Sequence, residues 1–272
     1  MIGSGNLATQ LTQALKAAGQ DIVQVYSPTA AHARELAEKL GCGYTTQVEN
    51  IRYDADVYLI AVKDDAIAKT AAAIATHISP FLRPFSSKRP EVERTLHPSP
   101  ILIHTAGSVP MSVLSTATAH YGVLYPMQTF SKNRRVDFKP IPCFIEASDV
   151  QTLKTIRTLA ESVSDHVVEA DSERRKKLHL AAVLACNLTN HCYRLAERVL
   201  EEEQTDFKLY LPLILETAHK VEQLSPREAQ TGPMVRYDTG VMAMQMALLS
   251  DERTKEIYRL MAESIHEDYA RK

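Results

Sequence analysis

The chain has 272 residues, 45% of them hydrophobic and 24% charged, and its 31 basic and 33 acidic residues leave a formal net charge of −2. This is the composition of a globular protein, and it excludes collagen-like and disordered classes. The charge balance argues against a nucleic-acid partner, and no apolar run approaches the roughly 18 residues of a membrane span. The four cysteines lack zinc spacing, so we expect no metal. With no signal peptide in view, we expect reduced thiols and a cytoplasmic protein.

The first 170 residues alternate short apolar runs with helical patterns, which is typical of an α/β Rossmann-like doubly wound sheet. Residues 79–100 interrupt the alternation with five prolines, and we expect a surface insertion there. The predicted helices cover 6–18, 30–40 and 66–77, and the predicted strands cover 22–26, 57–62, 101–105, 122–125, 143–146 and 166–169.

From residue 171 onward only helical patterns remain, over 178–203, 207–224 and 251–269. We therefore predict two domains, a Rossmann-like domain at 1–170 and an all-α domain at 171–272. The basic run from Arg174 to Lys177 lies beside Asp171 and Glu173, which indicates a solvated helix start.

The first strand is expected to end at Gly3, yet only Met1 and Ile2 precede it. Strands usually run about 5–6 residues, so we expect the natural chain to begin further upstream.

Residues 3–8 read Gly-Ser-Gly-Asn-Leu-Ala and match the pattern G-x-G-x-x-G/A. The first glycine permits a tight turn, the second admits a pyrophosphate, and the helix that follows offers its positive end to the anion. The match opens a helix and is followed by strand, helix and strand, which is the context that the motif requires. It predicts dinucleotide-binding residues Gly3, Ser4, Gly5, Asn6 and Leu7.

The second strand ends without the acidic residue that binds the ribose of NAD. Ser27 and Thr29 stand there instead and can bond a 2′-phosphate, with charge added by His32 or Arg34. We therefore favour NADP, with NAD as an open possibility. The alternative for Thr29 is that it merely caps the next helix.

Two further loops follow predicted strands and are expected to reach the cofactor, since ligands of such sheets bind at the carboxyl ends of the strands. Their candidate cofactor-binding residues are Val62, Lys63, Thr105 and Gly107.

Polar side chains share one face of the long helix that starts near residue 174. We predict catalytic roles for His179, Asn187 and His191 and substrate contact for Asn190. Gln128 and Arg236, in two loops, are predicted to contact the substrate as well, Arg236 by binding an anionic group. The alternatives are an ordinary solvated helix face, and an Arg236 that pairs with Asp238.

The motifs at 3–8, 125–130, 179–191 and 231–233 together resemble a family that joins a Rossmann-like domain to a helical domain of unknown function, DUF2520. That family is similar in architecture to pyrroline-5-carboxylate reductases and to 6-phosphogluconate and β-hydroxyacid dehydrogenases. The resemblance implies an NADP-dependent oxidoreductase whose helical domain forms a homodimer.

The sequence also departs from these relatives. Val183 stands where β-hydroxyacid dehydrogenases place a lysine, four residues before Asn187, and His179 is the candidate replacement. Pro28 occupies the place of an arginine that often holds the 2′-phosphate. We expect an NADP-preferring oxidoreductase that acts on a small carbonyl, hydroxy-acid or imine substrate in an interdomain cleft. The alternative function is a non-catalytic sensor or scaffold that binds a dinucleotide.

Overall fold

The computed structural model describes residues 1–82 and 100–271 of the chain and divides it into two compact units, 1–186 and 187–272. The division at 186/187 falls inside the helical segment that begins at Ser172. The first helix after residue 170 therefore belongs to the same unit as the sheet. The domain boundary expected at 170/171 stays a prediction. Within the part of the chain that the structure describes, no helix combines the length and the apolar character needed to cross a membrane.

The first unit contains the alternating helices and strands that the sequence predicts, and the ends of α2 agree residue for residue. Gly41 stops α2 in the left-handed conformation, with φ of 61°. The elements are α1 (Asn6–Ala17), β1 (Gln24–Tyr26), α2 (Ala30–Leu40), β2 (Gly43–Thr45), β3 (Val57–Ile60), α3 (Ile67–Leu82), β4 (Ile101–His104), β5 (Tyr121–Pro126), β6 (Cys143–Ala147), α5 (Val150–Val163), β7 (Val167–Glu169) and α6 (Ser172–Ala182).

Three elements of the first unit, β2, α5 and α3, differ from the sequence-based expectation. Strand β2 and helix α5 were not anticipated, the former because three residues carry no usable period. Helix α3 runs on to Leu82, so it includes the first residues of the insertion expected at 79–100. Residues 83–99 of that insertion lie outside the described residues.

The sheet has the order β3-β4-β5-β6-β7, beside a separate pair β1-β2. Ile2 lies between the two parts and bridges Tyr26 on one side and Ile60 on the other, both in parallel. Its amide donates to the Leu59 carbonyl at 2.8 Å, while the amide of Gly3 donates to the Tyr26 carbonyl at 2.8 Å. All paired strands are parallel except β6 against β5, and the doubly wound α/β fold class is confirmed.

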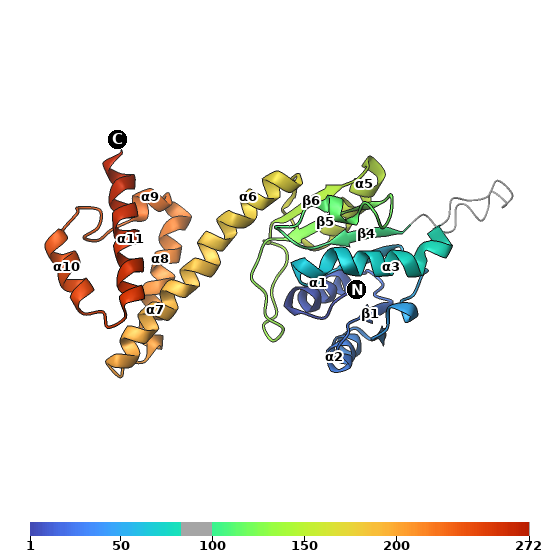
Figure 1. The fold of residues 1–272 in the computed structure, drawn as a ribbon, viewed down its shortest axis with the longest axis horizontal. Helices are drawn as coiled ribbons and strands as arrows, with labels where there is room; N and C mark the ends of the chain where they lie inside the picture. Colours follow the sequence, from blue (N-terminus) through green and yellow to red (C-terminus); the bar gives the residue numbers. More distant parts are fainter. Residues whose placement is uncertain (83–99, 272) are drawn as a thin grey trace. The chain divides into compact units, whose positions relative to one another are not determined.

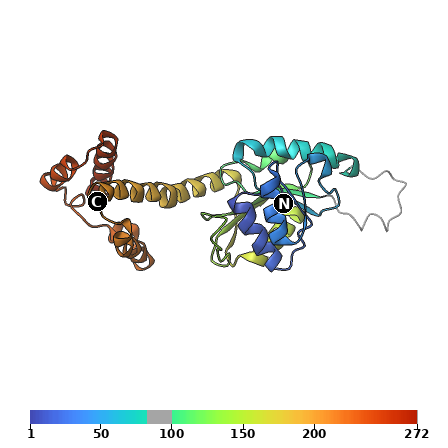
Figure 2. The same ribbon diagram turned by 90° about the horizontal axis from the view of Figure 1, so that it is seen from below.

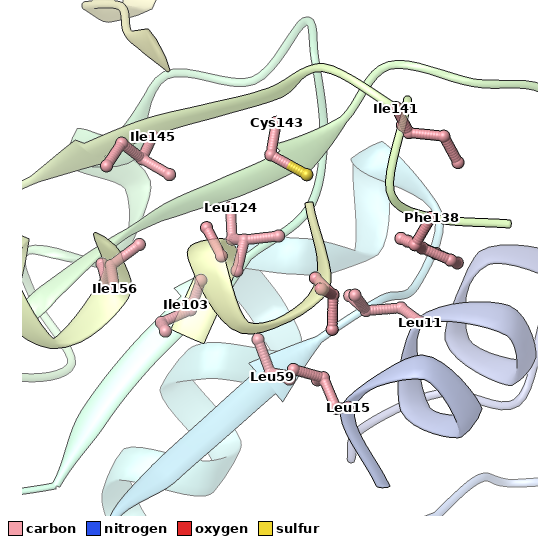
Figure 3. Packing of buried hydrophobic residues seen from close by; sticks show 12 residues of the cluster. Leu11, Leu15, Leu59, Ile103, Leu124, Phe138, Ile141, Cys143, Ile145 and Ile156 are labelled. Carbon is pink, nitrogen blue, oxygen red and sulfur yellow. The ribbon is translucent and has the colours of Figure 1, made fainter. Parts of the chain in front are cut away.

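Alternate strand residues enter two cores on opposite faces of the sheet, as the strand period of two requires. Leu59, Ile103 and Leu124 pack against Leu11 of α1 and Ile156 of α5 (Figure 3). The neighbouring strand residues Tyr58, Ile60 and Leu102 pack against α3 instead. Figure 2 shows the teal α3 and the dark blue α1 of this unit on opposite sides of the strands.

The second unit is all-α, as predicted (Figure 1). One π-helical turn, Val183–Leu188, follows α6 and leads into α7. The remaining elements are α7 (Thr189–Glu202), α8 (Leu211–Gln223), α9 (Pro226–Ala229), α10 (Thr239–Ala247) and α11 (Glu252–Ala270). Side chains set the helix starts: Ser225 and Glu228 form a capping box on α9, and Asp251 caps α11.

Candidate active site

The glycine turn before α1 is shaped to admit an anion. Gly3 has φ of 114°, and a Cβ there would overlap the carbonyl oxygen of Ala61, so only glycine fits. A Cβ on Gly5 would meet nothing within 4 Å, which leaves open space above the helix start. Gly5 is also the N-cap and no side chain caps the helix. The first amides of α1, at Asn6 and Leu7, therefore suit a pyrophosphate.

The end of β1 is tied to this turn through two hydroxyl groups. Ser4 donates to Ser27 Oγ at 2.8 Å, and both side chains are buried. Thr29 occupies the N-cap position of α2, but its side chain makes no capping bond and is exposed. Arg34, one turn into α2, donates from Nε to the Tyr44 hydroxyl at 3.1 Å and lies over its ring. Thr29 and Arg34 thus offer a hydroxyl and a positive charge near the end of β1.

The loops after β3 and β4 meet beside the turn, at the carboxyl ends of the strands. Val62 lies next to Gly3, with its Cγ1 3.5 Å from the position of a Cβ on that glycine. Lys63 is exposed and has no ion-pair partner within the described ranges. The Ser108 hydroxyl donates to the Asp64 carboxylate and joins the two loops. Thr105 is buried against the end of β3.

His179 is held against the β4 loop by Tyr125, the penultimate residue of β5. The Tyr125 hydroxyl lies 2.8 Å from His179 Nδ1, and the two rings meet edge to face with centroids 5.7 Å apart. A Cβ on Gly107 would stand 2.6 Å from that Nδ1 and 2.8 Å from Tyr125 Cζ. Glycine at 107 therefore lets the backbone of the β4 loop press directly on the histidine.

Helix α6, which carries His179, is anchored to the sheet by a buried ion pair. Arg175, one turn before His179, is fully buried and bonds the Glu146 carboxylate of β6. Its Nη2 also donates to the Val109 carbonyl at 2.6 Å. The hydroxyl and amide of Ser172 bond the same carboxylate. The prediction of a solvated helix start was wrong for Arg175, because its partner comes from a strand distant in the sequence.

A second buried polar side chain, His104, ends β4. Its Nδ1 accepts from the Ala106 amide at 3.2 Å, which leaves the hydrogen on Nε2, an atom without a hydrogen-bond partner among the residues described. Burial and the nearby charge of Arg175 lower the pKa of His104 to about 4. His104 is therefore neutral near pH 7 and serves the β4 loop structurally.

The other predicted site residues are mostly exposed. Asn187 lies in the π-helical turn, Asn190 and His191 lie on α7, and Arg236 lies in the turn before α10. Asp238 caps α10, and Arg236 forms no ion pair with the described residues. These four belong to the second unit, whereas His179 belongs to the first with the cofactor loops.

Gln128 is also exposed, and its side-chain oxygen accepts from the Thr129 amide. Sequence reasoning missed Tyr125 and Arg175. Tyr125 stands in the motif at 125–130, but only Gln128 of that motif was predicted to be a site residue, since no local pattern shows that the Tyr125 hydroxyl meets His179. Across residues 1–82 and 100–271, no three His, Cys, Asp or Glu side chains are grouped to hold a metal ion.

Comparison with known proteins gives two family matches, and the second spans the division between the two units at 186/187. Residues 1–80 match the family model described as NADP oxidoreductase coenzyme F420-dependent, and residues 141–265 match the domain of unknown function DUF2520. The crystal structure of the putative NADP oxidoreductase BF3122 from Bacteroides fragilis is 46% identical, with a TM-score of 0.86, and covers 98% of this chain and 96% of that one. No functionally curated protein matches.

More distant structures share the fold. Protein TM1727 from Thermotoga maritima is 20% identical with a TM-score of 0.72, over 98% of each chain. An imine reductase from Myxococcus stipitatus in complex with NADP+ is 15% identical with a TM-score of 0.59, over 99% of this chain and 91% of that one.

Proposed function

Because the chain belongs to the family of NADP oxidoreductases that join a Rossmann-like domain to a DUF2520 domain, we propose that it uses NADP on a small carbonyl, hydroxy-acid or imine substrate. The oxidoreductase class follows from the family. The preference for NADP over NAD, the substrate class and the residue roles are the proposal.

The nicotinamide dinucleotide would be held by the loops at the carboxyl ends of the strands. The turn at 3–7 would bind the pyrophosphate, for which Gly5 leaves room and α1 offers unbonded amides. Ser27, Thr29 and Arg34 would hold the 2′-phosphate, with Ser27 acting mainly by fixing Ser4. Val62, Lys63, Thr105 and Gly107 would line the path toward the nicotinamide. That ring supplies or accepts the hydride when bound.

His179 is the residue proposed to act on the substrate. The observation that carries this is its position against Gly107, in the loop expected to reach the nicotinamide. An imidazole there can polarise or protonate a carbonyl oxygen or imine nitrogen as negative charge develops on it. Asn187 and His191, with Asn190, Gln128 and Arg236 as substrate contacts, keep the roles predicted from the sequence. The π-helical turn around Asn187 favours a role for it, since such turns are frequent at functional sites.

Cofactor titration and a histidine variant test this proposal. NADPH and NADH are titrated into the purified chain while cofactor fluorescence is followed, and small keto acids and cyclic imines are then screened for NADPH oxidation. We expect tighter binding of NADPH, turnover of one substrate class, and a loss of about 100-fold or more in kcat for His179→Asn with unchanged NADPH affinity.

The matched control is His219→Gln, an exposed histidine paired with Glu222 on α8, which should keep full activity. If neither nucleotide binds, the proposal is wrong. Nucleotide binding with no turnover, and no effect of His179→Asn, would instead favour the dinucleotide sensor.

A homodimer formed through the helical unit is also part of the proposal. Its support is the large number of apolar side chains exposed on that unit, including Leu209, Leu213, Leu248 and Leu260. A cytoplasmic location is proposed on the four free cysteines, which are ordinary in a reducing compartment.

A further inference from the structure

We propose that Tyr125 is a positioning residue that donates its phenolic hydrogen to His179 Nδ1 and so holds the imidazole in the tautomer that carries hydrogen on Nε2. The inference rests on the proposed role of His179. It adds the direction of a hydrogen bond and the identity of the atom that the histidine presents to substrate.

The 2.8 Å contact between the phenol oxygen and Nδ1 admits two directions of donation. If Nδ1 carried the hydrogen and donated it, the phenolic hydrogen would need a second acceptor. Tyr125 is only 8% exposed, and Nδ1 is the hydrogen-bond partner of its hydroxyl within the described residues. Donation from the phenol satisfies both groups, because it leaves no buried hydroxyl hydrogen without an acceptor.

The charges around the phenol agree with this direction. Burial raises the pKa of Tyr125, the charge of Arg175 opposes that rise, and Asp64 adds to it. The phenol therefore keeps its hydrogen near pH 7 and remains a donor.

The phenol is also fixed in place, as an orienting group must be. Its ring stacks on Phe144 of the neighbouring strand, with centroids 6.2 Å apart and planes 28° apart. A Cβ on Gly107 would stand 2.8 Å from Cζ of the same ring, so the β4 loop also borders the phenol. The buried pair of Arg175 and Glu146 fixes α6 one turn before His179. Strand, loop and helix therefore define where the imidazole points.

The chemical consequence is that the ring hydrogen of His179 is assigned to Nε2. His179 is only partly buried, so its Nε2–H remains able to reach a ligand. When hydride adds to the carbonyl or imine carbon, the π electron pair moves to oxygen or nitrogen, and a hydrogen bond from Nε2–H stabilises that charge. Of the two roles proposed for His179, this tautomer therefore supports polarisation rather than protonation. The proton that completes the reduction comes from water, and His179 keeps its own.

Nitrogen NMR of the full chain labelled with 15N-histidine tests the tautomer without any substrate. At pH 7.5 we expect His179, assigned by its loss in His179→Gln, to show an unprotonated, hydrogen-bonded Nδ1 and a protonated Nε2. In Tyr125→Phe we expect both nitrogen signals to move toward tautomer-averaged values. With a substrate in hand, kcat should fall about tenfold while KM and NADPH affinity stay unchanged.

Tyr121→Phe is the matched control, since it removes a hydroxyl from the same strand and should leave the His179 signals in place. A wild-type spectrum that places the hydrogen of His179 on Nδ1 overturns the inference. This test uses only the wild-type chain, so it remains valid if Tyr125→Phe does not fold. An unchanged His179 spectrum in folded Tyr125→Phe overturns it as well. Either result leaves the proposed function in place if His179→Asn still abolishes turnover. Absence of cofactor binding, in contrast, rejects the proposed function but does not change the tautomer that the NMR spectrum shows.

Discussion

Single residues decide how closely the β4 loop approaches His179. Gly107 is placed where any side chain would collide with the histidine ring and with Tyr125. Glycine is usually explained by backbone conformation, but here the missing Cβ is what matters. A residue without a Cβ at position 107 is therefore required for the close contact between the β4 loop and His179.

Substitution of Gly107 by alanine should disturb His179 more than the fold. The added Cβ would stand 2.6 Å from Nδ1, so the ring must move, and we expect kcat to fall at least tenfold with a small change in Tm. Gly240→Ala is the control, because a Cβ there makes an ordinary 3.6 Å contact with Asp238. Wild-type activity in Gly107→Ala would contradict the close approach.

Arg34 should set the cofactor preference. Its guanidinium is oriented by Tyr44 and is exposed near the end of β1. In Arg34→Ala we expect the Kd of NADPH to rise about tenfold, the value of one charge-assisted hydrogen bond, while the Kd of NADH is unchanged. Arg52→Ala, which removes an exposed arginine paired with Asp54, should change neither value. Equal weakening of both nucleotides would argue against 2′-phosphate recognition.

At the scale of elements, α6 depends on one buried ion pair. Removing a single partner of such a pair leaves the other charge buried without compensation. Arg175→Met should therefore lower the free energy of unfolding by about 3–5 kcal/mol, measured by urea denaturation. The double variant Glu146→Gln with Arg175→Met should recover part of this loss, since no buried charge remains. A double variant no more stable than Arg175→Met would show that packing alone is responsible.

The end of β4 should make stability pH-dependent through His104. The folded-state pKa is lowered to about 4, so the neutral form favours the native state and protonation favours the unfolded chain. The contribution of His104 to the free energy of unfolding is fully present above its unfolded-state pKa of about 6.5. It is lost as the pH falls from there to about 4, and the loss is about 3 kcal/mol at most. In His104→Asn, whose side-chain oxygen can still accept from Ala106, the unfolding free energy should vary less over this range. An identical pH profile would exclude His104 as the cause.

The elements were predictable to different degrees, for physical reasons. Helix α2 has a full apolar period and a terminal glycine, so its ends could be read directly. The glycine turn was recognisable because all the residues of its motif lie within one short stretch, 3–8. Tyr125 and His179 stand 54 residues apart, and Arg175 pairs with Glu146 29 residues away. Such pairings depend on how strands and helices stack, which no local pattern records.

At the scale of the whole molecule, the helical unit exposes many large apolar side chains, and apolar side chains that gather in an exposed patch mark interaction sites. Leu209, which is 71% exposed, lies just before α8, and Leu213, which is 62% exposed, lies within it. If the proposed dimer forms through these residues, a Leu209→Glu, Leu213→Glu variant should be monomeric in light scattering after size-exclusion chromatography, because it would bury charge at the interface. Val150→Glu, at an 85% exposed position of α5, should leave the mass unchanged. A monomeric wild-type chain would refute the dimer.

The bridging by Ile2 has a consequence for ligand binding by the first unit. The β1-β2 pair is stitched to the other strands through the residues that directly precede the glycine turn. A diphosphate bound at the turn would contact the residues that join β1 to β3, so cofactor binding should lower the amide exchange rates of β1.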